Sequence, residues 1–167
     1  MSKSAFSISL LNAAHNRTEF CSGSAPLDRY FQQQVTQDVR RRVAACYVAL
    51  AADGRIAGYY TLAAASVLLQ ELPLAVLKKL PRYPTVPAVR MGRLAVDREF
   101  KGQGLGGALL ADALTRAIHS EIAAYAMLVD AKDKDAANFY LHHGFVALQQ
   151  APMTLFLPLA TVLRIKS

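Results

Sequence analysis

Residues 93–107 have the sequence RLAVDREFKGQGLGG, and this stretch indicates the fold class of the 167-residue chain. It joins an apolar, strand-like segment, residues 89–96, to residues 104–119, whose apolar positions recur at helical spacing. The glycines let the backbone turn tightly and let its amides approach a ligand closely. Because a helix starts there, several amides have no intrahelical partner, and together with the helix dipole they favour a bound phosphate. Lys101 adds a positive charge to this loop.

Three interpretations of the glycine loop are open at this point. The first is dinucleotide binding, since Gly102, Gly104 and Gly107 satisfy the GxGxxG pattern and Asp130 follows roughly 20 residues later. Five residues, 97–101, separate the strand from the glycines, however, whereas a dinucleotide loop follows its strand immediately. The second is a purely structural turn, which needs fewer glycines. The third is a loop that binds the pyrophosphate of an acyl-CoA, which the resemblance of the loop to a family signature, given below, implies. A Walker A loop is excluded because no Gly-Lys-Ser/Thr follows.

The rest of the sequence predicts one domain, residues 1–167, of the α/β (α+β) class. Asp53-Gly54 is a hairpin signal between two apolar segments, and Asp28 is a candidate helix N-cap. The expected strands cover residues 5–10, 43–52, 56–65, 89–96, 124–130, 145–148 and 153–157, and the expected helices cover residues 28–38, 70–80, 104–119 and 135–141.

Composition narrows the class of protein further. Apolar residues make up 53% of the chain, which excludes a disordered chain, and no apolar run is long enough for a membrane span. The N-terminus lacks a signal-peptide pattern, so we expect a cytoplasmic protein. Cys21 and Cys46 are expected to be reduced thiols, and no Cys/His spacing predicts a metal site.

The net charge of +7 favours an anionic partner such as CoA or RNA. Candidate phosphate-binding residues are the basic side chains that cluster in three parts of the sequence. They are Arg40, Arg41, Arg42, Lys78, Lys79, Arg82, Arg90 and Arg93.

The glycine loop resembles the Arg/Gln-x-x-Gly-x-Gly/Ala signature of the GNAT family of N-acetyltransferases, with Gly104 and Gly106 as its glycines and Lys101 where the family prefers Arg or Gln. The resemblance implies a twisted mixed sheet with a splayed fourth and fifth strand, helices on both faces, and acetyl-CoA as cosubstrate without a metal. The residues that it assigns to acetyl-CoA are Leu94, Val96, Lys101, Gly102, Gln103, Gly104, Leu105, Gly106 and Asn138.

A second family element lies downstream, in the stretch Asn138-Phe139-Tyr140-x-x-x-Gly144-Phe145. It resembles the family pattern in which a tyrosine acts as general acid toward the departing thiolate, and this position is Tyr140. No acidic residue occupies residues 91–96, where many members place a general base. His142 and His143 are expected to be exposed residues at a helix end.

The whole chain resembles one subgroup, the TacT-like aminoacyl-tRNA acetylating toxins of type II toxin–antitoxin modules. The segments that carry this resemblance are Phe20-Cys21-Ser22-Gly23 with Leu27-Asp28, residues 56–62, residues 93–97, residues 102–106, residues 138–145 and residues 154–157. It implies transfer of acetyl to the α-amine of aminoacyl-tRNA, a block of translation, and a homodimer. It also implies a ribbon-helix-helix (DUF1778-like) antitoxin, with operator DNA bound only through the antitoxin complex. A protein N-terminus or a small-molecule amine remains the alternative acceptor.

Overall fold

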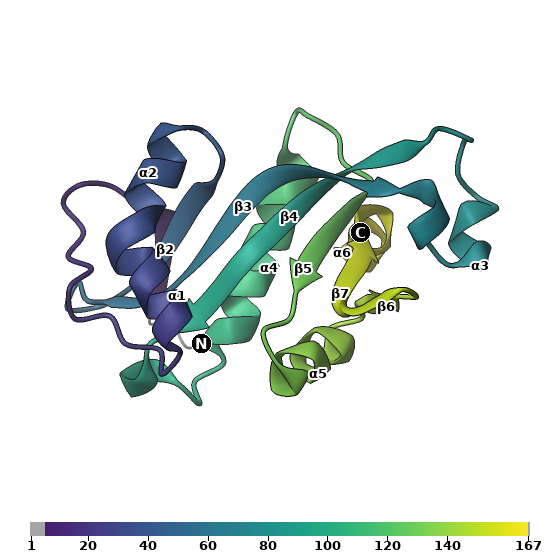
Figure 1. The fold of residues 1–167 in the computed structure, drawn as a ribbon. Coiled ribbons are helices and arrows are strands. Elements are labelled where there is room, and N and C mark those ends of the chain that lie inside the picture. Colours follow the sequence, from purple (N-terminus) through teal and green to yellow (C-terminus); the bar gives the residue numbers. More distant parts are fainter. Residues whose placement is uncertain (1–5, 167) are drawn as a thin grey trace. The chain divides into compact units, whose positions relative to one another are not determined.

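The computed structural model describes residues 6–166. The elements in chain order are β1 (Phe6–Leu10), α1 (Ala25–Arg29), η1 (Tyr30–Gln34), α2 (Val35–Arg40), β2 (Ala45–Ala51), β3 (Ile56–Leu68), η2 (Leu69–Glu71), α3 (Leu74–Leu77), β4 (Thr85–Val96), η3 (Arg98–Phe100), α4 (Leu105–His119), β5 (Ala126–Asp130), α5 (Lys134–His142), β6 (Val146–Leu148), β7 (Ala151–Pro158) and α6 (Leu159–Lys166) (Figure 1). Hydrogen bonds order the described strands as β1-β2-β3-β4-β5-β7-β6. Because β4 and β5 pair in parallel and the other recorded pairs are antiparallel, the predicted mixed sheet is confirmed.

The chain divides into two compact units. The first unit holds the residues up to 63 together with residues 93–113, and the second holds residues 64–92 and those from 114 on. The strands β3 and β4 and the helix α4 each contribute residues to both units.

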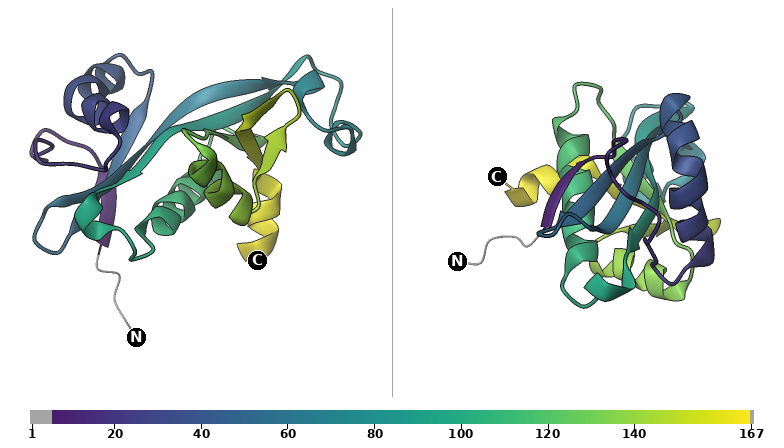
Figure 2. Two further views of the ribbon diagram at one scale, coloured as in Figure 1. Left: turned by 60° about the horizontal axis from the view of Figure 1, so that its bottom comes forward. Right: turned by 90° about the vertical axis from the view of Figure 1, so that its left-hand side faces the viewer.

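In the first unit, helices cover both faces of the antiparallel strands β1, β2 and β3. One face carries α1 and α2, and the beginning of α4 lies against the other (Figures 1 and 2). Side chains alternate between the faces along β3, because successive residues of a strand point in opposite directions. Tyr59 packs into the α1–α2 side, where its ring stacks on Phe31 with centroids 4.2 Å apart. The neighbouring Gly58 faces Leu105 and Leu109 of α4.

In the second unit, residues 88–91 of β4 pair in parallel with residues 126–129 of β5. β5 pairs antiparallel with β7, and β7 forms a hairpin with β6, which α6 follows in the chain (Figure 2). Phe156 and Leu128 are buried in the core of this unit. Both α5 and α6 pack against β7.

Three predictions about helices were wrong. The helix expected over residues 28–38 begins at Ala25, ends at Arg40 and contains the π-helical turn η1. Asp28 is not its N-cap; that position is Ser24, and the Asp28 carboxylate accepts hydrogen bonds from Ser22 instead. The helix expected over residues 70–80 is interrupted by Pro73, so only η2 and the four-residue α3 form. The C-terminal helix α6 was not predicted.

Candidate active site

The glycine loop follows a single 3-10 turn, η3, at the end of β4. Asp97 caps this turn, and its Oδ1 accepts a hydrogen bond from the amide of Glu99 at 2.9 Å. Gly102 and Gly104 have φ angles of +80° and +77°, in the left-handed region that residues with a Cβ rarely adopt. Among the described residues, nothing beyond their chain neighbours lies within 4 Å of a Cβ built on either glycine. The loop is therefore bent by its glycines and open to a ligand.

The helix α4 begins directly after the loop. Its first hydrogen bond runs from the amide of Ala108 to the carbonyl of Gly104 at 3.1 Å. The amides of residues 105–107 precede this bond and therefore have no acceptor within the helix. Because they lie at the positive end of the helix dipole, they suit a phosphate group.

The edge of β4 offers further backbone donors. The amide of Arg93 donates to Thr61 Oγ1 at 3.1 Å and the amide of Asp97 donates to the carbonyl of Ala57 at 2.8 Å, so both point toward β3. Amides alternate in direction along a strand, and those of Leu94 and Val96 therefore point to the opposite edge. In the second unit the ladder between β4 and β5 ends at Met91 and Val129, which leaves residues 92–96 of β4 beyond it.

Lys101, at the beginning of the loop, has a partner that was not predicted. Its Nζ donates a hydrogen bond to the carbonyl oxygen of Ser22 at 2.7 Å. Gln103 is exposed at the tip of the turn between the two left-handed glycines. The charge of Lys101 is thus directed toward the segment before α1, while the loop amides remain the groups presented to a ligand.

The helix α5, in the second unit, carries the predicted general acid. Its N-cap is Asp133, whose Oδ1 accepts a hydrogen bond from the amide of Ala136 at 2.8 Å. Tyr140 lies at the buried side of the helix, with 5% of its surface exposed, and its ring contacts that of Phe145 at 5.5 Å between centroids. Burial raises the pKa of the Tyr140 phenol, and the negative charge of Asp130 raises it further. The phenol is therefore protonated at physiological pH.

The other predicted residues of α5 face water. Asn138 is exposed, and so are His142 and His143, as expected for residues at a helix end. The ring of His143 packs against Phe139 with centroids 4.7 Å apart.

The predicted basic residues differ in solvent exposure and in their side-chain partners. Arg40 and Arg41 are exposed at the end of α2, and Lys78 and Lys79 are exposed after α3. Two other predicted RNA-binding residues already have partners within their own units. Arg90 forms an ion pair with Asp130, and the guanidinium of Arg93 lies 3.5 Å from the centroid of the Tyr30 ring.

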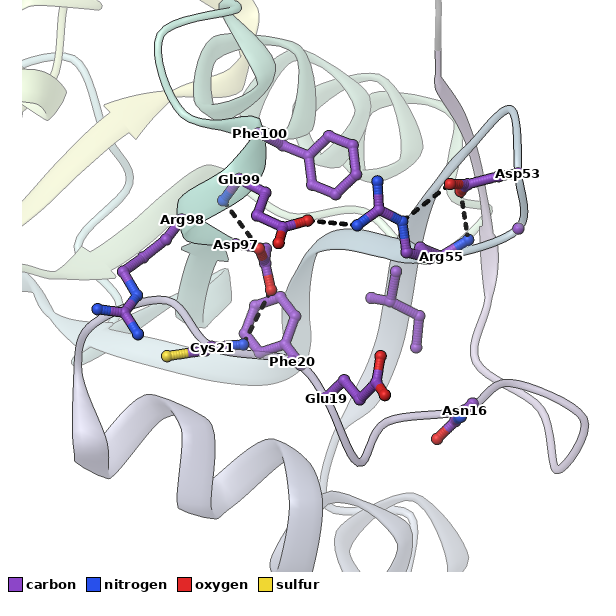
Figure 3. A pocket seen from close by; sticks show the side chains of 12 residues that line it. Asn16, Glu19, Phe20, Cys21, Asp53, Arg55, Asp97, Arg98, Glu99 and Phe100 are labelled. Carbon is purple, nitrogen blue, oxygen red and sulfur yellow. Dashed lines mark hydrogen bonds and ion pairs between the residues drawn. The ribbon is translucent and has the colours of Figure 1, made fainter.

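A pocket of about 390 Å³ lies beside η3, and sequence patterns did not predict it (Figure 3). Arg55 crosses one side of it, paired with Asp53 and Glu99 and lying over the ring of Phe100 at 4.9 Å. Asp97 also lines this pocket. The motif that indicates this residue in the sequence is Asp97-x-Glu99, a polar cap after an apolar strand.

The described residues contain neither a metal-binding cluster nor a membrane-spanning helix. No group of three or more His, Cys, Asp and Glu side chains in residues 6–166 is arranged to hold a metal ion. None of the helices in that range combines the length and the apolar character that a bilayer-spanning helix requires.

Comparisons with known proteins agree with this geometry. The model of the Acetyltransferase (GNAT) family matches residues 10–145. Over 149 residues the chain is 35% identical to a tRNA-acetylating toxin of Mycobacterium tuberculosis (strain ATCC 25618 / H37Rv), with 88% of each chain covered. The structure of AtaT complexed with acetyl-methionyl-tRNAfMet matches with a TM-score of 0.90 and 26% identity, covering 97% of this chain and 99% of the other.

The crystal structure of AtaTR bound with AcCoA matches with a TM-score of 0.84 and 25% identity, covering 98% of this chain and 99% of that one. The family model includes β4, the glycine loop and the helix that carries Tyr140. Because the family model matches most of the chain and the loop at the start of α4 is open to a ligand, we conclude that this chain belongs to the acetyltransferase (GNAT) family.

Proposed function

We propose that this protein transfers the acetyl group of acetyl-CoA to the α-amine of an amino acid charged on tRNA. The observation that carries the activity is the open glycine loop, whose amides at the start of α4 suit a pyrophosphate. The substrate class is supported by the 35% identity to a tRNA-acetylating toxin over 88% of both chains. Acetylation removes the nucleophile that forms the next peptide bond, so the expected effect is a block of translation.

The residues that we assign to acetyl-CoA lie in two groups. In the first unit, the loop residues Lys101, Gly102, Gln103, Gly104, Leu105 and Gly106 face the pyrophosphate, mainly through their amides. Leu94 and Val96, whose amides point away from β3, donate them to the pantetheine arm, as an added strand would. In the second unit, Asn138 is exposed and offers its side-chain amide to the same arm.

Tyr140 is the proposed general acid. In the reaction the amine nitrogen forms a bond to the thioester carbon, the carbon–sulfur bond breaks, and the thiolate takes a proton from the phenol of Tyr140. The amine nitrogen releases one proton to the solvent, and the Tyr140 phenolate takes one proton back from the solvent, which completes the exchange. Because burial raises its pKa, the phenol keeps this proton at physiological pH until a basic thiolate forms beside it.

The acceptor explains why no carboxylate is needed as a base near the end of β4. Residues 91–96 contain no acidic side chain. The α-amine of an esterified amino acid is less basic than a side-chain amine and is partly neutral at physiological pH. Such a nucleophile needs little help to lose its proton, whereas a lysine or polyamine nitrogen needs more.

The partners follow from the proposed substrate. Arg40, Arg41, Lys78, Lys79, Arg90 and Arg93 are proposed to contact tRNA phosphates, supported by the net charge of +7. We also propose that residues 1–167 act as one acetyltransferase domain, that two copies form a homodimer, and that the protein works in the cytoplasm, where charged tRNA is found. A ribbon-helix-helix antitoxin is the proposed regulator, and operator DNA is bound through their complex.

The test is acetylation of a total pool of charged tRNA with isotopically labelled acetyl-CoA, followed by mass spectrometry of the released amino acids. We expect label on α-amines of charged tRNA and none on deacylated tRNA. Tyr140→Phe removes only the hydroxyl, so kcat should fall by about 10²–10⁴, the usual contribution of a general acid, while CoA binding persists. Labelling of small amines or protein N-termini instead of charged tRNA would contradict the proposed substrate.

A further inference from the structure

A short segment before α1, residues 20–24, lies beside the turn that leads into the glycine loop, and we call it the strap (Figure 3). The amide of Cys21 donates to Asp97 Oδ2 at 2.9 Å, and the amide of Arg98 donates to the carbonyl of Cys21 at 2.8 Å. These two hydrogen bonds join the strap to both residues at the start of η3. The strap contains the whole sequence pattern Phe20-Cys21-Ser22-Gly23, to which the proposed reaction gives no role.

A second tie joins the strap to the far end of the same turn. Lys101 Nζ donates to the carbonyl of Ser22 at 2.7 Å. Ser22 is itself fixed, because only 4% of it is exposed and both its amide and its hydroxyl donate to Asp28 Oδ1, at 2.9 and 2.6 Å. Asp28 belongs to α1, so this helix holds Ser22 and Ser22 holds Lys101.

The strap is anchored in the core at its other end. The ring of Phe20 is 4% exposed and packs edge-on against Phe31 and Tyr59, with centroids 5.0 and 5.5 Å apart. Gln32 Nε2 donates to the carbonyl of Phe20 at 2.9 Å. The strap therefore contacts η3 from a fixed position in the first unit.

Asp97 is the group that connects the strap with the loop. Its side chain is largely buried, and each carboxylate oxygen accepts a different backbone amide, Oδ2 from Cys21 and Oδ1 from Glu99. One carboxylate thus fixes the strap and the turn that carries the glycine loop. An amide of the same size offers one acceptor and would point its own donors at the other N–H group.

We propose that Asp97 is a positioning residue for acetyl-CoA. It holds η3 against the strap, and the loop amides at the start of α4 are thereby kept in the arrangement that receives the pyrophosphate. The inference rests on the proposed function, in which this loop binds the cosubstrate's pyrophosphate. It adds that the strap and the Asp97 carboxylate set the affinity of the loop for the cosubstrate without touching that ligand.

The test compares Asp97→Asn with the wild-type protein on two acyl donors, acetyl-CoA and S-acetylpantetheine, which has no pyrophosphate. With acetyl-CoA, the variant should raise KM about tenfold, the loss typical of one hydrogen bond to a charged group, and leave kcat within about twofold. With S-acetylpantetheine, kcat/KM should be the same in both proteins. Calorimetric binding of CoA gives the same comparison without any acceptor.

Asp53→Asn is the matched control, because Asp53 lines the same pocket but pairs with Arg55 at the β2–β3 turn. This control should keep the wild-type KM for acetyl-CoA. Ser22→Ala removes the hydroxyl bond to Asp28 and should raise the same KM by a smaller factor, about threefold. It also keeps the inference testable if circular dichroism finds Asp97→Asn unfolded.

Two outcomes count against the inference, and they differ. If the wild type prefers acetyl-CoA but Asp97→Asn has an unchanged KM, or weakens both donors equally, Asp97 does not act through the pyrophosphate loop. If the wild type itself uses S-acetylpantetheine as well as acetyl-CoA, the loop does not bind the pyrophosphate, and the proposed function of the loop fails together with the inference.

Discussion

Gly58 sets how closely β3 approaches its neighbours in the first unit. A Cβ built on it would lie 2.9 Å from the carbonyl oxygen of Ala95 and 2.9 Å from Leu109 Cδ1. Backbone cannot give way as a flexible side chain does, so we expect Gly58→Ala to lower the free energy of unfolding by about 1–3 kcal/mol. Urea denaturation measures this change. Ser66→Ala, at an exposed site of the same strand, should stay within about 0.5 kcal/mol, and equal stability of the two variants would contradict the argument.

The backbone conformation of some residues could be predicted from the sequence, whereas the hydrogen-bond partners of others could not. Gly102 and Gly104 were predictable because their spacing before an apolar-periodic segment is typical of a turn into a helix, and both adopt positive φ. The partner of Lys101 was not, since Ser22 lies 79 residues away in the chain. Asp97 belongs to the recognisable stretch of residues 93–97, but its hydrogen bond to Cys21 joins residues 76 positions apart. Contacts of this kind depend on packing that no local pattern contains.

Among the elements, α5 depends on one capping side chain. The carboxylate of Asp133 satisfies the amide of Ala136, which otherwise has no partner at the helix start. We expect Asp133→Ala to lower the free energy of unfolding by about 1 kcal/mol. Lys134→Ala, at the next and equally exposed position, is the control and should change it by less than about 0.5 kcal/mol. Thermal denaturation of the two variants decides, and a Lys134 variant as unstable as the Asp133 variant would refute the cap.

Periodicity predicted the strands and α4 well because each has a regular apolar pattern with clear punctuation. It failed over residues 70–80, where leucines occur at helical spacing but Pro73 removes the hydrogen bond that a longer helix needs. It also missed η1, because a π-helical turn inserts a residue without changing composition. Aspartate is a residue type that favours the N-cap position, but the Asp28 carboxylate binds Ser22 and does not cap the helix.

At the scale of the whole molecule, stability should fall at alkaline pH. Burial raises the pKa of the Cys46 thiol to about 12, and it also raises the pKa of the Tyr30, Tyr59 and Tyr140 phenols. Above about pH 9 the unfolded chain therefore loses protons that the folded chain keeps. Between its unfolded and its folded pKa, each such group lowers the free energy of unfolding by about 1.4 kcal/mol per pH unit. For Cys46 this range runs from its unfolded pKa to about 12, whereas the tyrosines contribute only above about pH 10.

Urea denaturation at a series of pH values between 8 and 11, about the range in which thiols and phenols ionise, measures this slope. Cys46→Ala should make it less steep by about 1.4 kcal/mol per pH unit between pH 9 and 10. Cys21→Ala is the matched control, because Cys21 is only partly buried and its loss leaves the Cys46 thiol in place. An identical slope in wild type and Cys46→Ala would contradict the assignment.

The fold class could be predicted as a whole because the order of apolar strands and helices is visible in the sequence, and the mixed sheet agrees with it. The point at which the pairing of β4 with β5 ends could not be predicted, since Met91 and the residues after it are equally strand-like. Strand pairing is decided by tertiary contacts rather than by local preference.

The donors that we propose for the pantetheine arm belong to the main chain of β4, at Leu94 and Val96, and this has an evolutionary consequence. Nineteen of the twenty amino acids carry the same N–H group, so the side chains of this edge can drift without erasing its recognition chemistry. Proline alone would remove a donor. Distant members can thus keep a common cosubstrate while these strands have few identical residues. At these two positions, selection acts against proline and not in favour of one particular residue.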